Sequence, residues 1–208
     1  MTRTAKISSH DPKAIEKAQQ VLSAGGLIVF PTDTLYGLGC NPRNREALLS
    51  IYAAKERSNL KALPVLIGNL DQLEGFVQSV SDSAYRLMKV FWPGALTLVL
   101  PKKDGLLSEL TPYASLAVRM PNSAFALELL RTVGPLAVTS ANLSGQINPQ
   151  TAEEVLQQLA GKIDLIVDGG RLEIGQGSTI VDCSLSPLKL LREGPIRFEE
   201  ILSVAEET

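Results

Sequence analysis

The chain has 208 residues, of which 45% are hydrophobic and 20% are charged, and its formal net charge is -2. These values are typical of a globular protein with a substantial core, and the balanced charge argues against a broad surface for nucleic acid. The apolar runs are too short to span a membrane, no signal peptide is evident, and two cysteines make neither a disulfide framework nor a zinc motif. We therefore expect a cytoplasmic protein.

Helical and strand patterns alternate along the whole chain. In the first half they predict a helix opened by Asp11 and closed by the glycines at 25–26, a buried strand at 27–30, a loop at 31–39, a helix at 45–54, a strand at 63–67, and helices at 69–77 and 81–91. The second half is predicted to contain strands at 95–100 and 116–119, a helix capped by Asn122, a strand at 136–139, a helix at 151–159 behind a capping box of Thr151 and Glu154, strands at 165–167, 179–181 and 188–191, and a helix from about 198. This order indicates an α/β protein with a mostly buried sheet.

The loop after the first strand is a candidate binding segment, because ligands of α/β sheets usually bind at strand ends. Thr32, Asp33, Thr34 and Tyr36 place four polar side chains in it, and two glycines allow the backbone to approach a ligand closely. The alternative is a turn that is capped by the aspartate, with the tyrosine packed on the core.

A K-x-R pair, Lys55 and Arg57, follows the second predicted helix, and Lys61 adds a third cation nearby. Such a cluster can bind phosphate oxygens, or it can simply neutralise the C-terminal end of the helix. The apolar strand at 63–67 indicates that the cluster lies beside the sheet.

An S-x-N pair, Ser140 and Asn142, ends the strand at 136–139, and Thr139 and Ser144 lie beside it. Hydroxyl and amide groups can cap a turn, but these are more polar groups than a turn requires. We therefore expect this loop to help bind a ligand.

Two arginines, Arg119 and Arg192, end short strands, and Ser178 opens another. Each could belong to a strand-end turn or to a salt bridge. If the arginines converge with the K-x-R cations, they make a site for a triphosphate and a carboxylate.

Several familiar sites are absent from the sequence. Pro42 stands where a dinucleotide-binding fingerprint needs its third glycine, and no Walker A motif occurs. The single histidine, His10, lies in no motif, which argues against a Ser-His-Asp nucleophile and against a histidine metal site. We predict no metal site built by the protein itself and no covalent enzyme intermediate.

Seven segments occur in the order that is typical of the YrdC-type family of threonylcarbamoyl-adenylate synthases, which the chain closely resembles from about residue 10 to 202. These segments are PTDTLYGLG at 31–39, KER at 55–57, WPGALT at 92–97, AVRMP at 117–121, SAN at 140–142, GST at 177–179 and LREGP at 191–195. The resemblance implies a single domain over residues 1–208, with a twisted mixed sheet, flanking helices and a large, positively lined cavity.

The family's activity, which the resemblance implies here, combines L-threonine, bicarbonate or CO2, and ATP into threonylcarbamoyl-AMP and pyrophosphate, with Mg2+ accompanying the nucleotide. A partner transferase then carries the threonylcarbamoyl group to adenosine 37 of tRNAs that read codons beginning with A. The product would thus serve a tRNA modification, and the chain would be a nucleotidyltransferase.

The same motifs imply roles for individual residues. Catalytic roles would fall to Lys55 and Arg57. The residues expected to bind ATP are Arg57, Lys61, Ser115, Ser140, Asn142, Asn148 and Arg192. Those expected to bind threonine are Thr34, Arg119, Val138, through its backbone, and Ser178.

The chain departs from the family pattern at two positions. Leu66 stands where long members carry a histidine that touches threonine, and Ser58 stands where many members have a proline. The C-terminal domain and gating linker of the long form are also expected to be missing. Two alternatives remain open: an RNA-binding protein of this fold, and a paralogue that acts on another carbamoyl or acyl substrate.

Overall fold

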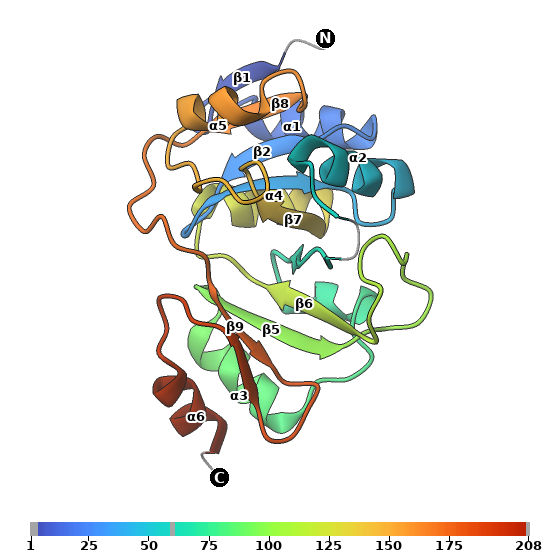
Figure 1. Cartoon of the computed structure of the whole chain (residues 1–208), viewed down its shortest axis with the longest axis vertical. Helices are drawn as coiled ribbons and strands as arrows, with labels where there is room; N and C mark the ends of the chain where they lie inside the picture. The colour runs from blue at the N-terminus through green and yellow to red at the C-terminus, as the bar shows by residue number, and fades with distance from the viewer. Residues whose placement is uncertain (1–3, 59–60, 207–208) are drawn as a thin grey trace.

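The computed structural model describes residues 4–58 and 61–206, in which helices and strands alternate (Figure 1). The strands are β1 (Ala5–Ser8), β2 (Ile28–Pro31), β3 (Tyr36–Cys40), β4 (Val65–Leu66), β5 (Leu96–Pro101), β6 (Ser115–Arg119), β7 (Leu136–Ser140), β8 (Leu165–Asp168), β9 (Thr179–Asp182) and β10 (Lys189–Arg192). The helices are α1 (Ala14–Ser23), α2 (Arg45–Lys55), the 3-10 helix η1 (Leu70–Gly75), α3 (Asp82–Phe91), α4 (Ala124–Val133), α5 (Ala152–Leu159) and α6 (Phe198–Glu206). The expected α/β class is therefore confirmed.

In the described part of the chain, the strands join one mixed sheet in the order β1-β8-β2-β3-β7-β4-β6-β5-β9-β10. The short strand β4 lies at the middle, antiparallel to β7 on one side and parallel to β6 on the other. The sheet is consequently narrow there. Figure 1 shows β1, β8, β2 and β7 as one group, and β6, β5 and β9 as a second group below it. We call β1, β8, β2, β3 and β7 the first half of the sheet, and β6, β5, β9 and β10 the second half.

Helices cover both faces of the first half of the sheet. In β2, Ile28 and Phe30 face one apolar cluster, which contains residues of α1 and α4, while Val29 faces the other cluster, which contains residues of α2 and α5. This explains why the strand reads as a continuous apolar run, as expected of a strand that is buried on both faces. In the second half, α3 and α6 pack against each other (Figure 1).

The predicted loop at 31–39 is wrong over its second half, where Tyr36–Cys40 forms β3 and pairs antiparallel with β2. The two strands make a hairpin in which Pro31 lies opposite Tyr36. The glycines of this segment are strand residues rather than turn residues. A Cβ atom at Gly37 would lie 2.7 Å from Cγ1 of Val138, so the glycine lets β7 pack closely against the hairpin.

Two predicted helix caps are shifted. The Asp11 side chain accepts a hydrogen bond from the Lys13 backbone, so it closes a turn before α1 rather than capping the helix itself. The cap of α4 is Ser123 rather than Asn122. By contrast, the Thr151 side chain accepts from the backbone N–H of Glu154 at the start of α5, as predicted.

Three further differences concern element type and extent. The segment predicted as a helix at 69–77 contains the 3-10 helix η1, and the strand predicted at 63–67 is limited to β4. Strand β1 was not predicted at all. Within the described residues, no helix is both long and apolar enough to cross a membrane.

Candidate functional site

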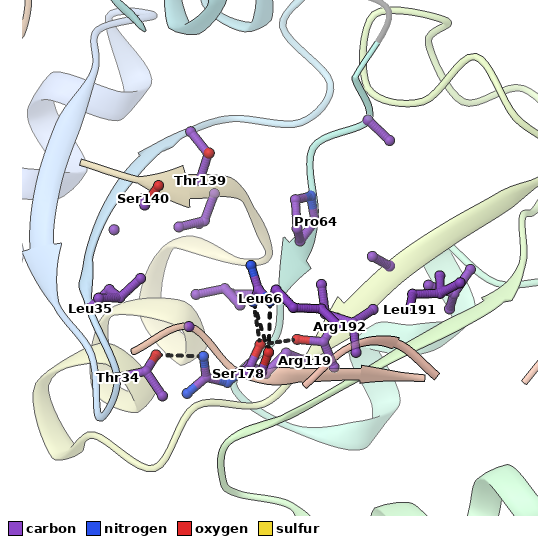
Figure 2. A pocket seen from close by; sticks show the side chains of 18 of the residues that line it. Thr34, Leu35, Pro64, Leu66, Arg119, Thr139, Ser140, Ser178, Leu191 and Arg192 are labelled. Atoms are coloured by element: carbon purple, nitrogen blue, oxygen red, sulfur yellow. Dashed lines mark hydrogen bonds between the residues drawn. The ribbon is translucent and has the colours of Figure 1, made fainter. Parts of the chain in front are cut away.

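A cavity of about 590 Å³ lies between the two halves of the sheet. Its walls come from the β2–β3 hairpin and β7 on one side and from β5, β6, β9 and β10 on the other (Figure 2). The expected site residues that line it are Thr34, Arg57, Ser115, Arg119, Val138, Ser140, Asn148, Ser178 and Arg192. Side chains that are far apart in the sequence thus meet around one hollow.

The charge of the lining is mixed. Arg57, Arg119 and Arg192 line the cavity, and so do the carboxylates Asp182 and Glu193. The lining therefore carries both positive and negative groups, whereas the resemblance implies a positively lined cavity. Because the arginines are partly or fully buried, desolvation lowers the pKa of each guanidinium.

At one end of the cavity, Arg119 meets the tip of the hairpin. Its Nη1 donates to the Thr34 hydroxyl at 2.7 Å, and its Nη2 lies 2.5 Å from a carboxylate oxygen of Asp33. Its Nε donates to the main-chain oxygen of Gly94 at 2.8 Å. Figure 2 shows the Thr34 hydroxyl pointing at Arg119. A hydroxyl beside a held guanidinium is suited to bind a small molecule that carries a carboxylate.

Ser178 and Arg192 form a second polar group in the same wall (Figure 2). The Arg192 guanidinium donates to the main-chain oxygen of Ser178 at 2.8 and 3.0 Å. The Ser178 hydroxyl lies 2.7 Å from the hydroxyl of Thr97, which is buried in β5. A Cβ atom at Gly177 would lie 2.8 Å from Arg192, so only a glycine there gives the guanidinium this position.

Arg57 reaches the cavity because α2 ends just before it. Glu56 adopts a left-handed conformation with φ 51° and turns the chain out of the helix. The Arg57 guanidinium then donates to the Thr139 hydroxyl at 2.9 Å and to the main-chain oxygen of Ala62 at 3.1 Å. Its buried Nε finds no hydrogen-bond partner among the described residues.

Lys55, in contrast, does not line the cavity. Its side chain is 2% exposed, and its ammonium donates to the main-chain oxygens of Ser140 and Asn142 at 2.5 and 2.6 Å. Burial, with a smaller contribution from Arg57, lowers the pKa of Lys55 to about 8. The expectation of a direct catalytic contact is thus not matched by its position, which is behind the S-x-N turn.

Asn142 belongs to the same buried network. Its side-chain oxygen accepts from the Ser140 hydroxyl at 2.6 Å, and its Nδ2 donates to the main-chain oxygen of Gln146 at 2.7 Å. Asn142 does not line the cavity, and neither does Lys61, whose side chain is exposed. The structure therefore brings most of the expected residues together and leaves Lys55, Lys61 and Asn142 outside the wall.

Sequence reasoning missed several cavity residues. Thr97 lies inside the WPGALT segment, and alternation along β5, which points Thr97 and Val99 to the same side, could have indicated it. Tyr113 and Asp182 also line the cavity, but they stand in segments with no motif that distinguishes them. The salt bridge considered for Arg119 is present, and its partner, which the sequence does not identify, is Asp33 of the loop at 31–39.

The sequence profile of the Sua5/YciO/YrdC family, described as telomere recombination, matches residues 20–194. The chain belongs to the Sua5/YciO/YrdC family. A family member from Bacillus subtilis, named threonylcarbamoyl-AMP synthase, is 44% identical over 204 residues, which cover 97% of this chain and 59% of that protein. This chain therefore spans little more than half the length of that relative.

Two solved structures of the Sua5/YciO/YrdC family extend the comparison. The structure of P. abyssi Sua5 complexed with L-threonine is 38% identical with a TM-score of 0.90, over 98% of this chain and 60% of that one. Escherichia coli YciO is 27% identical with a TM-score of 0.86, over 97% of this chain and 100% of that one. The chain therefore shares its fold with both structures.

Proposed function

We propose that this chain is a threonylcarbamoyl-AMP synthase that makes threonylcarbamoyl-AMP and pyrophosphate from L-threonine, bicarbonate or CO2, and ATP. In this role it is a nucleotidyltransferase, because it transfers the adenylyl group of ATP. One observation carries the proposal: arginines and hydroxyls from both halves of the sheet line one cavity, in a chain that is 44% identical to a relative of that name.

The amino acid is assigned to the end of the cavity where Arg119 meets Thr34. The guanidinium would bind the threonine carboxylate, and the Thr34 and Ser178 hydroxyls would bind its polar groups. The backbone of Val138 would complete the subsite. The relative that was solved with L-threonine supports this assignment.

The nucleotide is assigned to the remaining wall. Arg57 and Ser115 would bind the phosphates, and the exposed Lys61 would reach them from outside the wall. Ser140, Asn148 and Arg192 would hold the rest of the nucleotide. The buried Arg57 Nε is suited to a ligand oxygen, since it has no protein partner among the described residues. We assign Lys55 and Asn142 to hold the Ser140 turn in its shape.

The reaction needs positioning and charge stabilisation more than a nucleophilic side chain. The threonine amine attacks the carbon of CO2, which forms an N–C bond and releases a proton, so that a carbamate results. A carbamate oxygen then attacks the α-phosphorus, the bond to the bridging oxygen of the β-phosphate breaks, and pyrophosphate leaves. Arg57 would stabilise the charge that develops on the phosphates.

Mg2+ is proposed to arrive on the triphosphate and to neutralise part of its charge. Within the described residues, no group of three or more Asp, Glu, His and Cys side chains is arranged to hold a metal ion. Phosphate oxygens and water are the ligands that Mg2+ commonly takes with nucleotides, so the ion would depend on the bound ATP.

The proposed product is an activated intermediate, which implies a partner. A downstream transferase would pass the threonylcarbamoyl group to adenosine 37 of tRNA, in the cytoplasm. The RNA-binding alternative predicts affinity that falls steeply with salt and ignores threonine, whereas the synthase should bind ATP more tightly when threonine is present. The other alternative, a paralogue that acts on another carbamoyl or acyl substrate, predicts turnover that does not depend on L-threonine.

The test is pyrophosphate release by the purified protein with ATP and Mg2+. We expect release that depends on both L-threonine and bicarbonate, with L-serine as the control substrate. Arg57→Ala should reduce the rate strongly. Lys55→Ala should also reduce it, because the turn at Ser140 and Asn142 would lose the ammonium that holds its main-chain oxygens. Release without dependence on threonine, or normal rates in both variants, would contradict the proposal.

A further inference from the structure

Arg119 is held on three sides before any ligand arrives. It is 6% exposed, and its three guanidinium nitrogens each donate to one acceptor: Gly94, Thr34 or Asp33. A guanidinium has five N–H groups. The three contacts use one hydrogen on each nitrogen, so the two terminal nitrogens each keep a second hydrogen for a carboxylate.

Asp33 reaches Arg119 from the opposite half of the sheet. It stands at the tip of the β2–β3 hairpin, in the first half, whereas Arg119 ends β6 in the second half. The tip is shaped by Thr32, whose hydroxyl accepts from the backbone N–H groups of Thr34 and Leu35 at 3.2 Å. The ion pair therefore joins the two walls of the cavity at the amino-acid end.

Asp33 does not itself line the cavity, although its neighbours Thr32 and Thr34 do. Its side chain is 14% exposed, against 7% for that of Arg119. A ligand in the cavity would thus meet the guanidinium and the Thr34 hydroxyl, with the carboxylate behind them. The contact that links Asp33 to the ligand site is therefore its ion pair with Arg119.

We propose that Asp33 is a positioning residue that holds Arg119 in the orientation that receives the carboxylate of the amino-acid substrate. This inference rests on the proposed function, and it deepens that function by naming the group that fixes the amino-acid subsite. An unpaired buried arginine is costly, and its long side chain loses much rotamer freedom when it is fixed. With Asp33 in place, the guanidinium is paired and its side chain is already ordered in the folded protein, so substrate binding bears neither cost.

The direction in which threonine affinity changes when Asp33 is removed distinguishes an orienting role from a neutralising role. If Asp33 mainly neutralised Arg119, its removal would leave a stronger positive charge, and threonine would bind more tightly. If Asp33 mainly orients Arg119, its removal weakens threonine binding, because the guanidinium is no longer held in one orientation. The sign of the change in threonine affinity therefore decides between the two.

The experiment compares wild type with Asp33→Asn, which keeps the shape and an acceptor oxygen but loses the charge. Steady-state assays give the KM for L-threonine and for ATP, and inhibition assays give the Ki of L-threoninol. This amino alcohol keeps the amine, hydroxyl and methyl groups of threonine but lacks its carboxylate. Glu109→Gln is the matched control, because it removes the Arg45–Glu109 ion pair outside the cavity wall, in which the Glu109 side chain is 12% exposed, close to the 14% of Asp33.

We expect Asp33→Asn to raise the threonine KM about tenfold, the size of one charge-assisted hydrogen bond. The ATP KM and the threoninol Ki should stay within about twofold, since neither ligand uses the carboxylate contact. Asp33→Glu, which restores the charge, should recover part of the loss. Glu109→Gln should change none of these constants.

A threonine KM that is unchanged or lower in Asp33→Asn would overturn the inference. Equal losses for threonine and threoninol would also overturn it, because Asp33 would then act on the whole subsite rather than through the carboxylate contact. If wild type itself neither turns over threonine nor binds it, the proposed function fails first. An active wild type with an unaffected Asp33→Asn overturns this inference alone.

Discussion

The Nζ atom of Lys55 lies 2.6 Å from the main-chain oxygen of Asn142. The same ammonium contacts the main-chain oxygen of Ser140, which is 85 residues away in the sequence, at 2.5 Å. The K-x-R and S-x-N pairs are therefore two parts of one structural unit. In this unit Lys55 holds the turn, while Arg57 and Ser140 present polar groups to the cavity.

Lys55→Met should destabilise the fold. Methionine has a similar length but no donors, so the oxygens of Ser140 and Asn142 would be left buried without their ammonium. We expect a loss of about 2–3 kcal/mol in the free energy of unfolding, measured by urea denaturation at pH 7. ATP-dependent activity should fall together with stability.

The control for this change is Lys162→Met, which removes an exposed ion pair with Glu56 at 2.7 Å. Such surface pairs contribute less than about 1 kcal/mol, so its unfolding curve should lie close to that of wild type. If Lys55→Met is as stable as Lys162→Met but inactive, then Lys55 acts directly on the substrates and the positioning role is wrong.

The lowered pKa of Lys55 predicts a pH dependence of stability. Its pKa is about 8 in the folded chain and near the ordinary 10.5 in the unfolded chain. Between these values the unfolded state holds one more proton, so the free energy of unfolding gains roughly 1.4 kcal/mol per pH unit from this group. The stability gap between wild type and Lys55→Met should therefore widen from about pH 8 upward.

Urea denaturation of both proteins between pH 7 and 10 measures this gap. Since Lys55→Met lacks the titrating group, other ionisations are common to the two proteins and cancel. A gap that narrows as the pH rises would mean that the surrounding oxygens raise the pKa of Lys55 instead of burial lowering it.

Gly177→Ala should displace Arg192 without unfolding the chain. The new Cβ atom would lie 2.8 Å from the Arg192 Nη2, and this flexible side chain can move away. We expect the ATP KM to rise several-fold, by roughly the value of one or two hydrogen bonds, with little change in the melting temperature. Gly75→Ala is the matched control, because its Cβ would meet the tip of Arg43 at 3.2 Å, away from the cavity.

Thr97→Val tests the support of Ser178. Valine keeps the shape of threonine but removes the hydroxyl that lies 2.7 Å from the Ser178 hydroxyl. Because both groups are buried, stability should fall by about 1–3 kcal/mol, and the threonine KM should rise more than the ATP KM. Thr132→Val, which removes an exposed hydrogen bond to Glu128, should have little effect on either. Equal changes in the two KM values would argue against a role of Thr97 in the amino-acid subsite.

Most of the fold could be predicted because its strands and helices carry strong apolar patterns. Strand β3 could not, since Gly37 and Gly39 alternate with buried residues and resemble a turn. Strand β1 was missed for another reason: it is mostly exposed and shows no apolar pattern. Such an edge strand is specified by its pairing with β8, which no local signal reveals.

The site was predictable in its residue types and less so in its contacts. Polar groups at strand ends, such as Ser178 and Arg192, stand out in an apolar chain. Whether an individual cation faces the cavity depends on how its helix ends, and for this reason Lys55 points to the S-x-N turn while Arg57 reaches the wall. The pairing of Asp33 with Arg119 depends on the strand order, which the sequence does not display.

The central claim is that one cavity joins L-threonine, CO2 and the adenylyl group of ATP. The most direct test incubates the purified protein with ATP, L-threonine and bicarbonate labelled with carbon-13, and then identifies the products by mass spectrometry. We predict threonylcarbamoyl-AMP that carries the heavy carbon, which is absent without threonine and strongly reduced in Arg119→Ala. AMP and pyrophosphate formed without any labelled adduct, or an adduct formed equally well by Arg119→Ala, would contradict the account.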